Sequence, residues 1–230
     1  MINQKFFEFV TLFDRTKLNT RAGADKKRHY VTPEGKSYKS VTTILGEQVK
    51  PALEAWKKRV GPEEVNKAKR KGVSAANRGT ALHSLVERYM GNELIDPKQV
   101  LPSTLAMFAD IKGIIDDNID QVYGQEFSLY SDVLQTAGTC DAFVRFDGYP
   151  TVLDFKTSSK VKKEQYIGDY FLQCTVYALM LQERYNINVP RIAVLIGVEG
   201  EDPQLFVRKP SEFYSKVQQV FITDRAHERV

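Results

Sequence analysis

Apolar residues recur at helical spacing in two stretches of the chain. Within Ser74–Tyr89 they fall three, four or seven residues apart, and Gly91 follows as a stop signal. Leu105–Ile119 has the same spacing, with an apolar stripe that includes Phe108 and Ile115. These patterns predict two amphipathic helices, each with one face packed on a core.

The pattern then changes to short β-prone runs. Strands are predicted at Glu126–Tyr130, Ala137–Phe146, Thr151–Phe155, Arg191–Gly197 and Leu205–Val207. Asp147-Gly148 suits a tight hairpin turn between the second and third of these. Two more helices are predicted, a long one at Glu164–Tyr185 and a final one at Glu212–Ala226 with Ser211 as its cap. This order predicts a mixed α/β fold, with a central mixed sheet flanked by helices.

The first part of the chain reads as an appended subdomain. Two short β-prone runs, Arg28–Tyr30 and Lys36–Val41, flank a Pro/Gly turn and predict a hairpin. Helical pieces follow: Pro51 opens one that runs through Trp56, Gly61-Pro62 breaks it, and Glu63–Arg70 forms a second. We expect residues 1–72 to form a hairpin and a helical arch, and residues 73–230 to form the core domain.

Composition narrows the classes of protein and of site. No run of about 18 apolar residues occurs, so no membrane partner is expected. Met1–Val10 resembles neither a secretory signal nor a transit peptide, which favours an intracellular protein, not a secreted one. Two cysteines are too few for an iron–sulfur cluster or a cysteine-only zinc site, and the three histidines lack metalloprotease spacing. A bound metal would therefore have mostly oxygen ligands, which favours Mg²⁺ or Mn²⁺.

Positive charge is concentrated in the expected arch. Between Lys50 and Lys71 there are eight Lys and Arg against three Glu, a net charge of +5, whereas the whole chain has +4. Such a segment suits a polyphosphate, although a solvated helix face gives the same pattern. Within it, Lys57, Lys58 and Arg59 are the expected nucleic-acid contacts.

The candidate chemistry lies on two neighbouring predicted strands. Asp154 and Lys156 are two residues apart, so on a strand both side chains project to one face. Asp141, on the preceding strand, can reach the same ion as Asp154, and the carbonyl of Phe155 adds an oxygen. This set would hold a divalent ion with positions open for a phosphate, and Lys156 would stabilise the charge that develops there. A cross-strand ion pair gives the same Asp-x-Lys string without any chemistry.

Two predicted helices add polar groups at helical spacing. His83 and Glu87 are four residues apart; His83 is a candidate metal ligand, with a buried histidine beside a glutamate as the alternative. Gln173 and Tyr177 also share a helix face and could donate hydrogen bonds to a phosphate, or form a polar helix edge. Glu126 reads more readily as a surface residue than as an outer carboxylate.

Taken together, four strings resemble the PD-(D/E)xK nucleases of the RecB and lambda-exonuclease type. They are Arg78-Gly79-Thr80 with His83 and Glu87, Gly138-Thr139-Cys140-Asp141, Leu153-Asp154-Phe155-Lys156-Thr157-Ser158, and Gln173 with Tyr177. The upstream strings His29-Tyr30, Ser40–Leu45 and Trp56-Lys57 extend the resemblance to the mitochondrial genome maintenance exonucleases and their phage-borne relatives. The proline of the family name is absent, because Leu153 precedes Asp154.

The resemblance implies a restriction-endonuclease-like core and a Mg²⁺- or Mn²⁺-dependent deoxyribonuclease. It implies exonuclease action on single-stranded DNA, or on duplex ends, with the strand threaded beneath an arch, in DNA replication, recombination or repair. Asp141 and Asp154 would be metal ligands with His83 and the Phe155 carbonyl, Lys156 the catalytic lysine, and Gln173 and Tyr177 supporting groups. Arg78, Thr157 and Ser158 would contact the DNA, and Tyr38, Trp56 and neighbours of Phe155 would stack bases or lie in the core. A duplex exonuclease, a structure-specific endonuclease and a catalytically idle DNA-binding module remain alternatives, and the oligomeric state stays open.

Overall fold

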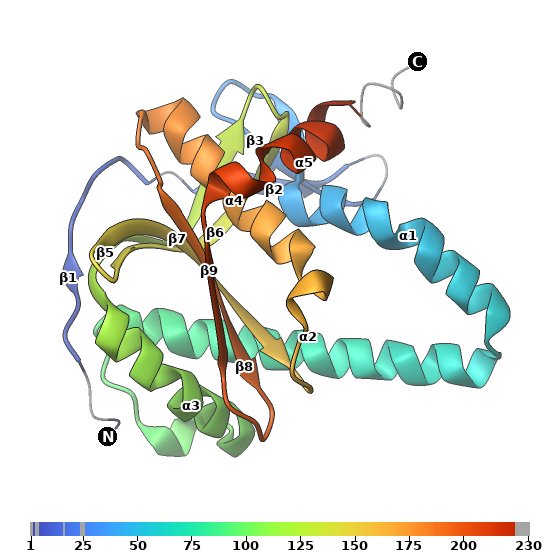
Figure 1. Ribbon diagram of the computed structural model, residues 1–230, viewed down its shortest axis with the longest axis horizontal. Coiled ribbons are helices and arrows are strands. Elements are labelled where there is room, and N and C mark those ends of the chain that lie inside the picture. Colours follow the sequence, from blue (N-terminus) through green and yellow to red (C-terminus); the bar gives the residue numbers. More distant parts are fainter. Residues whose placement is uncertain (1, 3–4, 16, 24–25, 224–230) are drawn as a thin grey trace.

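The computed structural model describes residues 2, 5–15, 17–23 and 26–223, and it places a nine-stranded mixed sheet at the centre (Figure 1). The strands pair in the order β2-β3-β4-β6-β7-β8-β9, with β5 also on β6 and β1 on β5. Their bounds are β1 Glu8–Phe9, β2 Asn19–Ala22, β3 Arg28–Val31, β4 Ser37–Ser40, β5 Ile119–Ser131, β6 Thr136–Phe146, β7 Tyr149–Ser158, β8 Arg191–Val198 and β9 Gln204–Arg208. All the predicted strands and the N-terminal hairpin are therefore confirmed.

Helices cover both faces of the sheet, as Figure 1 shows. Their bounds are α1 Val41–Arg59, α2 Pro62–Met90, α3 Pro102–Asn118, α4 Gly168–Tyr185 and α5 Tyr214–Gln218. Side chains alternate along β7: Val152 packs with α4 and α5 in one core, and Leu153 packs with α2 and α3 in the other. The predicted mixed α/β architecture is thus confirmed, and every helix among the described residues is too short or too polar to span a bilayer.

Strand β6 lies at a fork in the sheet. Along one side it pairs with β5; along the other, Thr136 and Ala137 pair with β4, whereas Ala142 to Phe146 pair with β7. Between these pairings, Gly138 to Asp141 have no strand partner on that side. The fork therefore leaves Asp141 beside a gap that side chains from α2 and α4 can reach.

Helices α1 and α2 form a V whose closed end points away from the sheet (Figure 1). Ser40 caps α1, because its hydroxyl accepts a 3.0 Å hydrogen bond from the Thr43 amide, and Val41 anchors the first turn in the core. Pro51 was expected to open this helix but lies inside it. Because of this cap and the buried first turn, the helix begins at Val41, ten residues before Pro51.

Helix α2 is continuous where two helices were predicted. Its 29 residues include the expected pieces Glu63–Arg70 and Ser74–Tyr89, with Pro62 in its first turn. Gly72 does not end it, since an exposed glycine costs a helix only about 1 kcal/mol. The expected boundary between residues 72 and 73 lies inside α2, and β4 joins the central sheet; the division into two domains remains a prediction.

Two other predicted helices have different starts. A 3-10 turn, Glu164–Tyr166, precedes α4, so the expected helix from Glu164 is interrupted near Ile167. The expected last helix begins as a 3-10 turn at Pro210, continues through α5 and ends in a π-helical turn, Gln219–Thr223. Ser211 lies inside the first turn rather than capping it, and positions 224–226 of that helix lie outside the described residues.

Candidate active site

A cavity of about 520 Å³ opens at the fork of the sheet. Seven elements contribute to it: β3 of the hairpin, the helices α1, α2 and α4, and the strands β5, β6 and β7. Its lining residues are Arg28, Thr42, Gly79, Thr80, His83, Ser84, Glu87, Glu126, Thr139, Asp141, Lys156, Gln173 and Tyr177. Five of the sequence-predicted site residues therefore share one cavity: His83, Asp141, Lys156, Gln173 and Tyr177.

Three side chains converge on one point of this cavity. Ligand atoms of His83, Glu126 and Asp141 all lie within 4.8 Å of one another. The Nδ1 atom of His83 is 3.8 Å from Oε1 of Glu126 and 3.5 Å from Oδ2 of Asp141. Two carboxylates and an imidazole form a possible metal-binding cluster, the single one of its kind in the described part of the chain.

Strand register and helix packing explain this convergence. On β5 and β6, Gln125 pairs with Ala142 and Phe127 with Cys140, so Glu126 lies opposite Asp141. Glu126 has a φ of 44°, a left-handed backbone that is uncommon outside glycine and re-aims its side chain. On α2, buried Leu82 and Leu85 fix the helix rotation that brings His83 to the two strands.

The environment of His83 favours its charged form. Its Nε2 lies 2.5 Å from the carbonyl oxygen of Phe155, to which it donates, so Nδ1 is left facing the carboxylates. Burial lowers the pKa of His83, but Glu126, Asp141 and Asp154 outweigh it and raise the pKa to about 9. At 3.8 Å the contact with Glu126 is an ion pair rather than a hydrogen bond.

Asp154 and Lys156 form a buried ion pair beside the cluster. Nζ of Lys156 lies 2.6 Å from Oδ1 and 2.5 Å from Oδ2 of Asp154. Burial lowers the pKa of Lys156, but Asp154 and Asp141 raise it more, so the lysine stays an ammonium; burial raises the pKa of Asp154 to about 6. The ring of Tyr170 lies 5.2 Å from the same Nζ. Asp154 therefore contacts the lysine here, and its role as a metal ligand remains a prediction.

Asp141 ties the two strands together. Its Oδ2 accepts a 3.0 Å hydrogen bond from the backbone N–H of Phe155, in a part of β7 that has left the β6 ladder. The Phe155 carbonyl accepts a hydrogen bond from His83, and its role as a metal ligand remains a prediction. One carboxylate thus positions the backbone that carries Lys156.

Gln173 and Tyr177 reach the cavity from α4. Both side chains are buried, and burial raises the pKa of Tyr177 well above its usual value. Gly138 makes room for this tyrosine: a Cβ there would lie 2.6 Å from the Tyr177 hydroxyl oxygen. The hydroxyl and the amide are neutral groups that can donate to an anion in the cavity.

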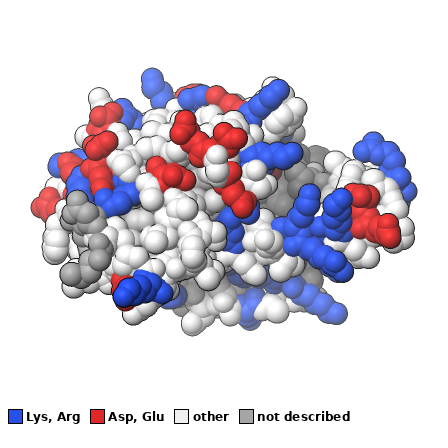
Figure 2. Space-filling view, turned by 90° about the horizontal axis from the view of Figure 1, so that it is seen from below, with Lys and Arg blue, Asp and Glu red and all other residues white. Residues whose placement is uncertain are grey.

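The expected DNA contacts lie in different surroundings. On α1, Lys58 and Arg59 are exposed, and Lys57 pairs with Glu54 at 2.8 Å. Figure 2 shows Lys and Arg side chains gathered over the protruding end of the V, next to a smaller acidic patch. The side chain of Lys50, which the charge count included, lies outside the described part of the structure.

Other expected contacts are tied up within the fold. Arg78 pairs with Glu199 at 3.3 Å, and the hydroxyl of Thr157 faces Gly79 on α2. Ser158 is buried, and its hydroxyl donates to the carbonyl of Lys160 and accepts from the N–H of the same residue, so it stabilises the turn that follows β7. Phe155, whose neighbours were expected to stack bases or lie in the core, is itself 3% exposed and lies in the core.

Several residues of the cavity were not selected as site residues from the sequence, among them Glu126, Arg28, Thr42, Ser84 and Thr139. Glu126 was judged a surface residue, although the predicted strands already allowed it to lie opposite Asp141. Arg28 and Thr42 carried no signal, because their approach depends on how the hairpin and α1 fold back to the fork.

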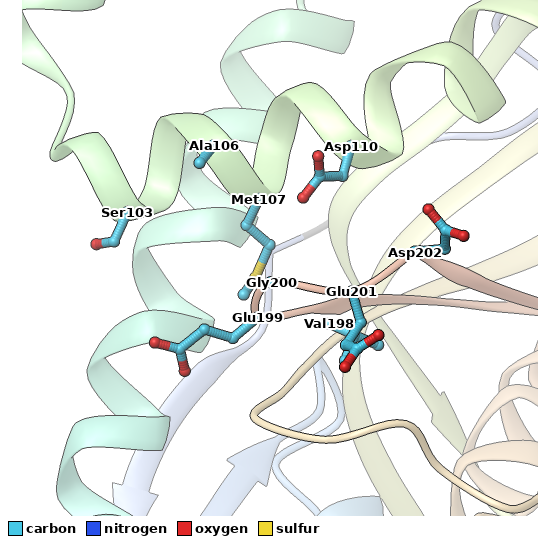
Figure 3. Close-up of a pocket in the computed structure, with 9 residues that line it drawn as sticks. All are labelled: Ser103, Ala106, Met107, Asp110, Val198, Glu199, Gly200, Glu201 and Asp202. Carbon is cyan, nitrogen blue, oxygen red and sulfur yellow. The ribbon is translucent and has the colours of Figure 1, made fainter.

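A second hollow, of about 550 Å³, lies between α3 and the β8–β9 loop (Figure 3). It is acidic, but Figure 3 shows the carboxylates of Asp110, Glu199, Glu201 and Asp202 spread around it rather than converging on one point. The His83 cavity is therefore the stronger candidate for metal chemistry.

Comparisons with known proteins do not assign this chain to a family. No family profile matches the chain, and no curated protein matches its sequence. Among solved structures, a crystal structure from Eubacterium rectale described as a "Putative exonuclease" matches with a TM-score of 0.40 and 9% identity, covering 64% of this chain and 66% of that one. The chain thus spans just under two thirds of that protein, and a likeness this weak carries no weight for function.

Proposed function

We propose that this protein is a Mg²⁺- or Mn²⁺-dependent deoxyribonuclease. The observation that carries the proposal is the convergence of His83, Glu126 and Asp141 in an open cavity that Lys156 also lines. Oxygen-rich donor sets of this kind suit Mg²⁺ and Mn²⁺, and the imidazole is compatible with Mn²⁺. The residues present therefore fit such an ion.

His83, Glu126 and Asp141 would hold the ion, with Asp154 and the Phe155 carbonyl as the further ligands that the family resemblance implies. When bound, the ion polarises a phosphoryl oxygen and makes an attacking water more acidic. The Lys156 ammonium, kept charged by Asp154, would stabilise negative charge that develops on the phosphate. Gln173 and Tyr177 would orient phosphate oxygens by hydrogen bonds.

The finer form of the proposal is exonuclease action on single-stranded DNA. It is supported by the family resemblance and by the basic V of α1 and α2, which borders the cavity through Thr42 and Thr80. A duplex exonuclease and a structure-specific endonuclease use the same site. A catalytically idle DNA-binding module is the alternative of another class.

Linear single-stranded, linear duplex and circular single-stranded DNA, labelled at each end, separate these forms. With Mg²⁺ or Mn²⁺ we expect the linear single strand to shorten from an end and the circle to survive. EDTA should stop the reaction, and added metal should restore it. Digestion of the circle would identify an endonuclease, and binding without cleavage would identify an idle module.

Matched carboxylate variants test the site itself. Asp141→Asn and Glu126→Gln should each lower the cleavage rate at least about a hundredfold, because the metal's charge stabilisation amounts to several kcal/mol. Glu93→Gln, an exposed carboxylate outside the cavity, is the control. Wild-type rates in a folded Asp141→Asn protein would refute the proposed function.

A further inference from the structure

Three basic side chains line the candidate active site, and they differ in their partners. Lys156 is paired with Asp154, and His83 faces Glu126 and Asp141. Arg28 has no carboxylate partner within the described residues, and it is exposed. A guanidinium on a cavity wall that has no counter-ion among the described residues is available to an anionic ligand.

We propose that Arg28 is a positioning residue that binds the phosphate adjoining the one cleaved, an inference that rests on the proposed nuclease function. The residue belongs to β3 of the N-terminal hairpin, next to the His29-Tyr30 string, and no site role was assigned to it from the sequence. It would add a substrate contact from an element other than those that carry the metal cluster.

Arg28 is held in place by its neighbours. Its guanidinium carbon lies 5.5 Å from the centre of the Tyr30 ring, and Nη2 donates to the Thr42 hydroxyl at 3.4 Å. The Tyr30 hydroxyl in turn lies 3.2 Å from that of Thr139, two residues before Asp141 on β6. The guanidinium is thus connected, contact by contact, to the strand that carries the metal cluster.

The electrostatics of the cavity explain why this cation matters. Glu87, Glu126 and Asp141 repel a polyanion, and burial together with the charge of Glu126 raises the pKa of Glu87. A metal held by His83, Glu126 and Asp141 would offset that repulsion for the phosphate bound to it, and a cation at Arg28 would do the same for the neighbouring phosphate. A planar guanidinium suits it, because it can donate two parallel hydrogen bonds to phosphate oxygens.

Single neutral linkages in the substrate test this contact directly. Short single-stranded oligonucleotides with one methylphosphonate, placed at successive positions from the labelled end, would be cleaved under single-turnover conditions. With the wild-type protein, a neutral linkage next to the cleaved bond should slow cleavage about ten- to a hundredfold, the range for one charge-assisted hydrogen bond. Arg28→Gln should slow cleavage of the natural strand by a similar factor, yet show no further loss with that linkage.

Two further variants separate positioning from folding. Arg28→Lys keeps the charge and should recover part of the rate, whereas Arg21→Gln, an exposed arginine on the adjacent strand β2 and outside this cavity, should match wild type. Calorimetric Mn²⁺ binding and the thermal midpoint should be unchanged in all three.

The failures of the two proposals are distinguishable. If wild type cleaves with metal but Arg28→Gln is equally fast, or remains as sensitive as wild type to every neutral linkage, the assignment of Arg28 is wrong and the nuclease stands. If wild type neither cleaves nor binds any of the strands, the proposed function fails first.

Discussion

His83 joins the two halves of the candidate site through its two ring nitrogens. Nε2 donates to the Phe155 carbonyl on β7, which fixes the ring, and Nδ1 faces the carboxylates of β5 and β6. Groups that orient a metal-binding imidazole in this way are common around metal sites. Without metal, the carboxylates instead stabilise the protonated ring.

The stability of the metal-free protein should therefore depend on pH. The pKa of His83 is raised from 6.5 to about 9 in the folded state, so its contribution is fully present below pH 6.5 and is lost as the pH rises through about 9. The unfolding free energy in EDTA should fall by on the order of 3 kcal/mol over that range. Denaturant unfolding of wild type and His83→Gln checks this: the variant should lack the fall, and identical pH profiles would contradict it.

Gly138 leaves no room for a side chain next to the site. Ala at this position would place its Cβ 2.6 Å from the Tyr177 hydroxyl oxygen and 2.9 Å from Cε1 of the same ring. Because Tyr177 is buried, we expect Gly138→Ala to cost about 1–3 kcal/mol of unfolding free energy and to slow cleavage by displacing the ring. Gly113→Ala on α3, where nothing lies within 4 Å, is the control and should be neutral or stabilising.

Spacing in the sequence predicted some of the site residues and not others. Asp154 and Lys156 were expected on one strand face and do contact each other, and Asp141 lies beside them as the neighbouring strand required. Glu126 was undervalued, because its approach needs a left-handed backbone that no residue type signals. The position of Glu126 therefore depends on the folded backbone and not on the residues around it in the sequence.

At the scale of elements, local signals located the strands better than the helix ends. Pro51 suggested a start, yet the start of α1 is fixed by the Ser40 cap and the burial of Val41. Gly61-Pro62 did separate α1 from α2, since proline is accommodated in a first turn. Tertiary packing therefore decided where the helices begin.

The V of α1 and α2 has a testable electrostatic role. Lys58→Glu with Arg59→Glu should weaken binding of single-stranded DNA and lower the slope of log affinity against log salt by about 1.4, since each of the two single-strand phosphate contacts contributes about 0.7. Fluorescence anisotropy at several salt concentrations, with Ca²⁺ in place of Mg²⁺, measures both quantities.

The matched control reverses two lysines at the other end of the chain. Lys209→Glu with Lys216→Glu makes the same change in net charge outside the V and should leave the slope unaltered. Equal slopes for the two double variants would mean that α1 contributes only to the overall field of the molecule.

At the scale of the whole molecule, charge is strongly divided. Residues 15–39 hold eight Lys and Arg against two acidic residues, and residues 50–71 hold eight against three. Since the chain as a whole has a net charge of +4, the remaining residues together carry −7. The two basic segments both reach the cavity, through Arg28 of the hairpin and through the V, so a polyanion is attracted toward the cavity and away from the rest of the surface.

The order of elements in the sequence predicted the overall architecture, but it did not predict the fork at β6. Helices, then strands, then helix and strands predicted a mixed sheet flanked by helices, as observed. That β4 shares one side of β6 with β7 depends on a pairing between segments about a hundred residues apart, Ser40 with Ala137, which no local pattern encodes. Placing the cavity therefore required the three-dimensional fold.

One consequence follows from α2 being a single uninterrupted helix. The N-terminal half of α2 forms the protruding end of the V, and its C-terminal half carries His83. The directions in which side chains of the two halves point are therefore fixed relative to each other. A residue inserted between them would turn the far end by about 100° about the axis relative to the imidazole, whereas seven residues, close to two turns, would nearly restore it. Length changes in homologous chains should therefore gather at the Val60-Gly61 joint, where no such geometric penalty applies.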